Sequence, residues 1–233
     1  MRKNIITLAV LTTLSLSALA SDYKAGDIVV RGGLTMVDPN SDKAGVYVEA
    51  IGGNTPLSIA VDDNTQLGLN VVYFFDRNWA VEVLAATPFT HDVTIYDPQG
   101  GSEEIFGTNV DGVTLGEVTH LPPTVSALYY FDTASNFKPY IGLGVNYTIF
   151  FDEKFKDTPK SLGFNDLKLD GSFGLSAQVG ADYQLNNNWQ VNASVRYIDI
   201  NTEANFKIGD LIKGSADIEV DPMVFSVMLG YKF

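Results

Sequence analysis

Residues 173–185 read FGLSAQVGADYQL, and apolar and polar residues alternate through the whole stretch. The odd-numbered positions, from Phe173 to Leu185, carry apolar or aromatic side chains or alanine. The even-numbered positions carry only Gly, Ser, Gln and Asp. Successive side chains of a β-strand point to opposite faces, so this stretch predicts a strand with one oily and one polar face.

Seven further segments repeat the alternation, some more weakly, at residues 28–37, 66–75, 79–87, 124–131, 140–149, 189–197 and 223–233. Short links rich in Asp, Asn and Ser join some of them, at residues 76–78, 132–138 and 186–188. The other connections are long, at residues 38–65, 88–114, 152–168 and 201–218. The sequence therefore predicts an all-β fold, an eight-stranded antiparallel up-and-down barrel with turns at one end and long extracellular loops at the other.

Alternation by itself fits both a soluble barrel, with the oily face inside, and a transmembrane barrel, with the oily face toward lipid. Aromatic residues at the strand ends favour the membrane, because such residues form girdles at the lipid–water interface. They are Tyr73, Phe75, Trp79, Tyr129, Phe131, Tyr183, Trp189, Tyr231 and Phe233. The chain also ends on an aromatic residue, which is typical of clients of the outer-membrane assembly machinery. We therefore expect outer-membrane lipid and this machinery as partners.

The N-terminus has the features of a signal peptide. Arg2 and Lys3 precede an apolar run, and Ala18-Leu19-Ala20 has the form of a signal-peptidase site. We expect cleavage after Ala20, export to the outer membrane of a Gram-negative cell, and a single barrel domain over residues 21–233.

Composition excludes several classes of function. The formal net charge of −13 argues against nucleic acid as a partner, since phosphate binding needs clustered Lys and Arg. No cysteine is present, which excludes disulfides and thiolate metal sites. The two histidines, His91 and His120, have no neighbours at metal-ligand spacing. No metal or cofactor is predicted.

Several longer motifs are distributed along the chain: residues 85–89 (AATPF) with His91, 119–124 (THLPPT), 140–151 (YIGLGVNYTIFF), 178–183 (QVGADY), 197–202 (YIDINT) and 221–222 (DP). On these motifs the chain resembles the OmpW family of eight-stranded outer-membrane proteins. The resemblance implies a narrow barrel with a partly apolar interior, proposed to admit small hydrophobic molecules. Arg196 occupies a lumen position where relatives carry an aromatic residue, which argues against a simple aromatic gate.

Four charged residues fall on the inward face near the turn end: Arg31, Glu82, Asp182 and Lys232. Opposite charges in a low-dielectric interior should pair, because an unpaired buried charge is costly. We expect a salt-bridged plug that fills the narrow barrel; an ion pathway is the alternative.

Large apolar residues interrupt the polar face and are expected to line a pocket open toward the loops: Leu84, Leu128, Phe150 and Met228. Apolar residues within the first long loop fit the same pocket: Val46, Tyr47, Val48, Ile51, Leu57 and Ile59. The alternative is that the loop residues pack only on one another.

These features predict that a small hydrophobic solute enters through the loops, meets the plug and leaves sideways between strands into the membrane. A structural or adhesive barrel, or a surface receptor, is the main alternative. A lipid hydrolase that uses His120 with Ser126 and a carboxylate is a third hypothesis. We do not expect an enzyme.

Overall fold

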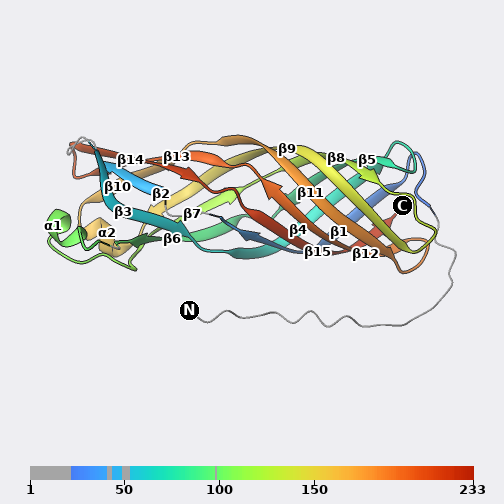
Figure 1. Cartoon of the computed structure of the whole chain (residues 1–233), viewed down its shortest axis with the longest axis horizontal. Coiled ribbons are helices and arrows are strands. Elements are labelled where there is room, and N and C mark those ends of the chain that lie inside the picture. Colours follow the sequence, from blue (N-terminus) through green and yellow to red (C-terminus); the bar gives the residue numbers. More distant parts are fainter. Residues whose placement is uncertain (1–21, 41–43, 49–52, 98) are drawn as a thin grey trace.

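The computed structural model describes residues 22–40, 44–48, 53–97 and 99–233 (Figure 1). The predicted signal peptide, residues 1–20, and Ile51 lie outside this part of the chain. The strands are β1 (Ile28–Asp38), β2 (Ala44–Val48), β3 (Gly53–Val61), β4 (Asn64–Phe74), β5 (Trp79–Ala86), β6 (Phe89–Tyr96), β7 (Thr114–Leu121), β8 (Thr124–Tyr130), β9 (Phe137–Phe155), β10 (Phe164–Leu169), β11 (Ser172–Gln184), β12 (Trp189–Ile198), β13 (Asn201–Ile208), β14 (Ile212–Glu219) and β15 (Met223–Lys232). Two short helices are α1 (Ser102–Phe106) and α2 (Asp157–Ser161).

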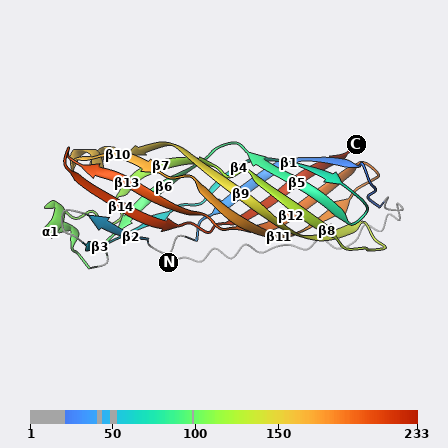
Figure 2. The same cartoon turned by 90° about the horizontal axis from the view of Figure 1, so that it is seen from above.

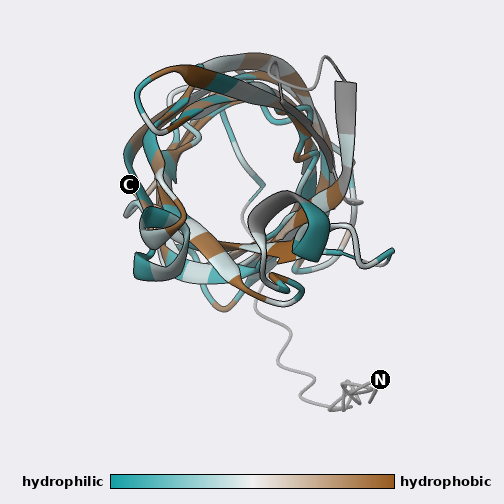
Figure 3. Ribbon diagram, turned by 90° about the vertical axis from the view of Figure 1, so that its left-hand side faces the viewer, coloured by the Kyte–Doolittle hydropathy of each residue, from teal (hydrophilic) through white to brown (hydrophobic). Residues whose placement is uncertain are grey.

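Eight strands form a closed antiparallel ring that we call the lower barrel: β1, β4, β5, β8, the first part of β9, β11, β12 and β15. Each strand pairs with its neighbours in this order, and β15 pairs with β1 to close the ring. Figure 3, viewed from the end that carries α1 and α2, shows the strands as a ring. The predicted eight-stranded up-and-down barrel is confirmed.

The oily face of the lower barrel points outward, as the aromatic residues at the strand ends predict. Leu143 and Phe173 are 73% and 70% exposed, whereas Arg31 and Asp182 on the alternate face are fully buried. An apolar surface of this kind suits contact with acyl chains.

The long connections are mostly not irregular loops. β2, β3, β6, β7, β10, β13 and β14 continue the wall above the lower barrel together with residues 149–155 of β9, and we call this part the upper storey (Figures 1 and 2). β9 is 19 residues long and belongs to both parts. Pairing satisfies the backbone N–H and C=O groups that an irregular connection would leave to other partners.

The two faces of the strands exchange character at the boundary between the storeys. In β13, Thr202, Ala204 and Phe206 are buried, whereas Asn201 and Glu203 are exposed. The outer surface of the upper storey also carries ion pairs, such as that of Lys156 with Glu117 at 2.6 Å. The oily side chains therefore face lipid around the lower barrel and the interior in the upper storey, and the boundary marks the top of the membrane-spanning belt.

Candidate functional site

A network of buried ion pairs crosses the lumen of the lower barrel. The Arg31 guanidinium from β1 donates to the Glu82 carboxylate from β5 at 3.2 Å and to the Asp182 carboxylate from β11 at 2.8 Å. Tyr130 accepts a further hydrogen bond from Arg31 at 2.6 Å. The structure thus brings together three of the four charged residues that the sequence placed on the inward face.

Arg196 from β12 belongs to the same network, which we call the plug. Its Nη2 donates to the Glu82 carboxylate and, at 2.8 Å, to the Gln178 amide oxygen. The Gln178 amide nitrogen donates in turn to Glu82 at 3.0 Å. The plug therefore holds two guanidinium groups and two carboxylates, and this pairing offsets the cost of removing the charges from water.

Lys232 does not join these ion pairs. Its Nζ lies 3.8 Å from the Asp27 carboxylate, nearer the turn end of the barrel. The strand register explains why Lys232 lies at a different height from Arg31. Lys232 is opposite Val29, whereas Arg31 is opposite Gly230. Side-chain alternation places both residues inward but does not give their relative heights.

Tyr23 closes the plug from the turn end, and the sequence patterns missed it. Its hydroxyl donates to the Asp182 carboxylate at 2.7 Å and also lies 2.7 Å from the side-chain amide of Gln190. Its ring stacks on Phe74 with centroids 4.0 Å apart. Because Tyr23 precedes the first alternating segment, strand periodicity gave no signal for its position.

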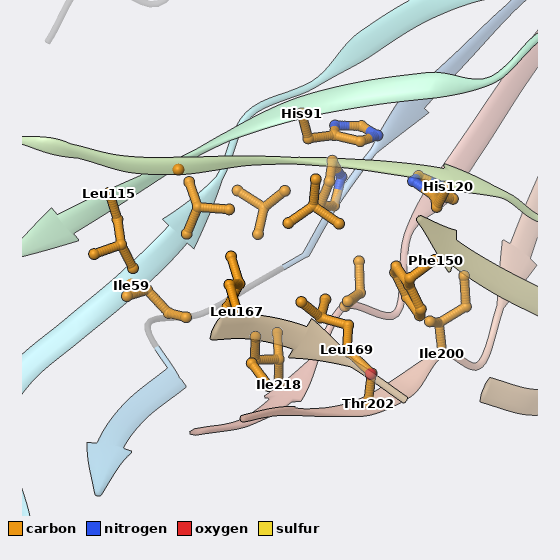
Figure 4. Close-up of a pocket in the computed structure, with 17 residues that line it drawn as sticks. Ile59, His91, Leu115, His120, Phe150, Leu167, Leu169, Ile200, Thr202 and Ile218 are labelled. Atoms are coloured by element: carbon orange, nitrogen blue, oxygen red, sulfur yellow. The ribbon is translucent and has the colours of Figure 1, made fainter. Parts of the chain in front are cut away.

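An apolar cavity lies in the upper storey above the plug, with a volume of about 60 Å³. Figure 4 shows Leu115 and Ile59 toward one end and His120, Phe150 and Ile200 toward the other. A cluster of buried residues forms the floor between cavity and plug: Val37, Phe89, Ile198, Ile200 and Val224. The cavity is lined by Pro39, Ile59, Val61, His91, Val93, Leu115, Gly116, Val118, His120, Phe150, Leu167, Leu169, Ile200, Thr202, Ala204, Ile218 and Val220.

Of the four residues predicted to form a pocket, Phe150 is the one that lines this cavity. Leu84 and Met228 are buried inside the lower barrel, and Leu128 packs with Tyr23 and its neighbours near the turn end. The alternation correctly pointed these side chains inward. It could not show that the wall continues upward and that the cavity forms there, so the expected grouping is corrected.

Apolar residues of the first long loop both line the cavity and pack on one another. Ile59 lines the cavity, and Leu57 and Ile59 pack in the core of the upper storey with Val93 and Ile95. Packing among loop residues and lining of a pocket therefore occur together. The side chains of Val46, Tyr47 and Val48 lie outside the described residues.

The two histidines, which lie 29 positions apart in the sequence, are neighbours in the structure. The rings of His91 on β6 and His120 on β7 stack with centroids 5.0 Å apart, and His120 also stacks on Phe89 at 5.6 Å. The His91 Nδ1 lies 2.5 Å from the backbone carbonyl oxygen of Asp62. Among the described residues, no group of three or more His, Cys, Asp and Glu could hold a metal ion.

The hydrolase hypothesis requires His120 beside Ser126, and the structure separates them. Ser126 lies in the lower barrel opposite Glu82, whereas His120 lies in the upper storey opposite Phe150. The Ser126 hydroxyl is buried without a hydrogen-bond partner in the described part of the chain. The geometry gives no support to a catalytic pair.

Comparison with known proteins identifies the family. The OmpW family matches residues 24–233. The chain belongs to the OmpW family. It is 46% identical to outer membrane protein W of Vibrio cholerae, with all of both chains covered. The crystal structure of the outer membrane protein OprG from Pseudomonas aeruginosa is similar with a TM-score of 0.81 and 39% identity, covering 91% of this chain and 98% of that one.

A more distant relative is the dibenzothiophene metabolism operon protein PahQ of Pseudomonas aeruginosa, 27% identical over 76% of this chain and 75% of that protein. Membership of the OmpW family, together with the transmembrane barrel, places the protein in the outer membrane. The family resemblance read from the sequence motifs is confirmed.

The wall of this OmpW-family barrel is interrupted where the storeys meet. The β5–β8 ladder ends at Leu84 and Thr124, and the β6–β7 ladder starts at Phe89 and His120. Between them lie residues 85–88 and 121–123, including Pro88, Pro122 and Pro123. Proline has no N–H to donate to a ladder, so this break, which we call the wall gap, follows from the sequence.

The wall gap lies next to both the cavity and the apolar outer surface. Phe89 is buried at the gap, and its ring stacks on His120 of the cavity wall. On the outside, Leu67 accepts a hydrogen bond from the Thr87 backbone N–H and is 64% exposed. Tyr147, bonded through its N–H to the Pro123 carbonyl, is 53% exposed.

We predict that Glu82→Gln destabilises the barrel by about 3 kcal/mol, because it leaves two buried guanidinium groups facing a single carboxylate. Urea unfolding of the barrel refolded into lipid vesicles measures the change. Glu203→Gln on the exposed face of β13 is the matched control and should change stability by less than about 0.5 kcal/mol. Equal effects of the two substitutions would contradict the role given to the plug.

We predict that the His120 imidazole stays neutral at pH 5. Burial, with a smaller contribution from His91, lowers its pKa from 6.5 to about 3. A folded-state pKa below the unfolded value means that the unfolded chain binds the extra proton, so stability is lost as pH falls from about 6.5 toward 3. Titration of the ring resonances by NMR measures the pKa, and a midpoint near 6.5 would show that the site is hydrated.

Proposed function

We propose that the protein is a narrow outer-membrane conduit that admits small hydrophobic molecules into the cavity of the upper storey and releases them sideways into the membrane. The observation that carries this proposal is a carbon-lined cavity directly above a closed polar plug in which both guanidinium groups and both carboxylates form ion pairs. The first feature accepts an apolar solute, and the second closes the path straight through the barrel.

The axial route is unfavourable for two reasons. An eight-stranded barrel has an interior only wide enough for its own side chains, and here they cross the lumen from opposite walls. An apolar solute would also have to separate Arg31 from Glu82 and Asp182 without offering hydrogen bonds in return. A solute that reaches the floor of the cavity therefore needs another way out.

The wall gap offers that way out. Opening a paired ladder costs backbone hydrogen bonds, whereas three prolines already remove donors between Leu84 and Phe89 and between His120 and Thr124. Displacement of the Phe89 ring would connect the cavity with the surface around Leu67 and Tyr147. Burial of apolar area favours each step at about 25 cal/mol per Å² removed from water.

The name of one relative is consistent with a small hydrophobic solute. PahQ is named for an operon of dibenzothiophene metabolism, and dibenzothiophene is an apolar fused aromatic compound. This name supports a hydrophobic solute class for the family and leaves the particular solute of this chain open.

A disulfide across the wall gap tests the lateral exit. The chain has no cysteine, so Ala85→Cys with Pro123→Cys introduces the only thiols. We expect the oxidised variant to lose most uptake of the fluorescent apolar probe N-phenyl-1-naphthylamine into proteoliposomes, and dithiothreitol to restore it. Val83→Cys with Val125→Cys, which join registered partners one step below the gap, should leave uptake unchanged.

Two outcomes would contradict the proposal. If the gap disulfide forms, as shown by its migration on a non-reducing gel, and uptake continues at the wild-type rate, the exit lies elsewhere. A large ion-selective pore in planar-bilayer recordings of the wild-type protein would contradict the closed base.

A further inference from the structure

A second, smaller cavity lies at the outer end of the upper storey, with a volume of about 10 Å³. We call it the outer cavity and the cavity described above the inner cavity. The outer cavity is lined by Ile95, Val110, Val113, Leu115, Thr158, Pro159, Leu162 and Phe164. Among the described residues, Leu115 is the one that lines both cavities.

Leu115 stands between the two cavities. Figure 4 shows it at the end of the inner cavity away from His120 and Phe150. Along the chain, Val113 comes just before it and lines the outer cavity, whereas Val118 comes just after it and lines the inner cavity. A molecule that moves from the outer cavity to the inner one therefore passes this leucine side chain.

The backbone of Leu115 is fixed, whereas its side chain has room to turn. The carbonyl oxygen accepts a hydrogen bond from the Lys156 N–H at 3.0 Å, which ties β7 to the segment that leads into α2. The side chain packs against the cluster of Phe155, Phe164 and Phe206 and against the core of the upper storey, but it is only half-buried. A loosely enclosed leucine can change rotamer without any movement of the backbone.

Two connections, rather than wall strands, cover the outer cavity. Val110, which is 2% exposed, comes from the connection between β6 and β7, and the buried Pro159 comes from α2. Figure 1 shows α1 and α2 at the end of the molecule away from the C-terminus. Neither Val110 nor Pro159 belongs to a strand of the described chain, so this cover can move without loss of ladder hydrogen bonds.

Resting on the function proposed above, we infer that Leu115 sets the size limit of the entry route. A solute displaces the cover, enters the outer cavity and passes Leu115 to reach the inner cavity. A small apolar molecule passes the side chain in its resting rotamer, whereas a bulkier one has to turn it aside. Leu115 is thus a specificity-determining residue that selects apolar solutes by their width.

Two probes that differ by one phenyl group test this size limit. They are 1-naphthylamine and N-phenyl-1-naphthylamine, and their uptake into proteoliposomes is corrected with protein-free liposomes. We expect Leu115→Ala to lower the ratio of the two uptake rates, smaller probe over larger, by about fivefold. The reason is that the larger probe no longer has to turn a leucine out of its rotamer.

Leu167→Ala is the matched control. Leu167 is also half-buried and packs against the same two clusters, but it lines only the inner cavity. The substitution removes the same atoms from the wall and leaves the division between the cavities intact, so the ratio should keep its wild-type value. Heat-modifiable migration on a gel verifies that each variant has folded.

A reversible block gives a second readout within one folded protein. The chain has no cysteine, so Leu115→Cys introduces a single thiol. Benzyl methanethiosulfonate attaches a benzylthio group to it through a disulfide and releases methanesulfinate. We expect the attached group to slow uptake of N-phenyl-1-naphthylamine by about tenfold, because a side chain too large for its site raises the barrier, and dithiothreitol to restore it. Leu211→Cys, at a position 92% exposed, should keep its uptake after the same treatment.

Three results would overturn the inference: equal changes of the ratio in Leu115→Ala and Leu167→Ala, unchanged uptake after mass spectrometry has verified the attached group, or a Leu115→Cys thiol that the apolar reagent does not reach. The failures are distinguishable. Wild-type protein that takes up neither probe beyond protein-free liposomes contradicts the proposed function itself. Uptake that the wall-gap disulfide stops, but that is insensitive to Leu115, refutes only the size limit.

Discussion

The structure depends on one constraint: lipid surrounds the lower barrel, so the polar half of every alternating strand must be satisfied inside a ring of eight strands. Arg31, Glu82, Asp182 and Arg196 meet this constraint by pairing across the lumen. Side chains too long for one wall reach the opposite wall, and glycines leave room for them; a Cβ at Gly180 would lie 2.5 Å from the Tyr140 ring. The need for paired charges in a narrow lumen therefore closes the base of the barrel.

Above the membrane, the polar side chains have to face outward instead of inward. Water surrounds the upper storey, so its strands turn polar residues such as Glu117 and Glu203 outward and apolar ones such as Val118 and Ala204 inward. An upper wall with an oily interior thus stands directly on a ring with a polar interior. The cavity is a consequence of this exchange of faces, and the wall gap lies where the exchange occurs.

The function that we propose follows from the solvation of the two storeys. In this proposal an apolar molecule moves from water into the upper storey, is stopped by the plug, and leaves through the wall gap at the level of the apolar outer belt. The proposal thus assigns capture, obstruction and release to three separate groups of residues.

Alternation along the chain predicts the eight strands of the lower barrel and places Arg31, Glu82 and Asp182 on one face, because the facing of side chains is a local property of a strand. The aromatic strand ends add that the oily faces point outward. Residues 201–208 alternate as well, with their polar residues facing outward, although they fall in a connection that was predicted to be a long loop. The sequence could not predict the heights of Lys232 and Leu128, the position of Tyr23 or the meeting of His91 with His120. These depend on strand register and on contacts between distant segments, which periodicity along one strand does not encode.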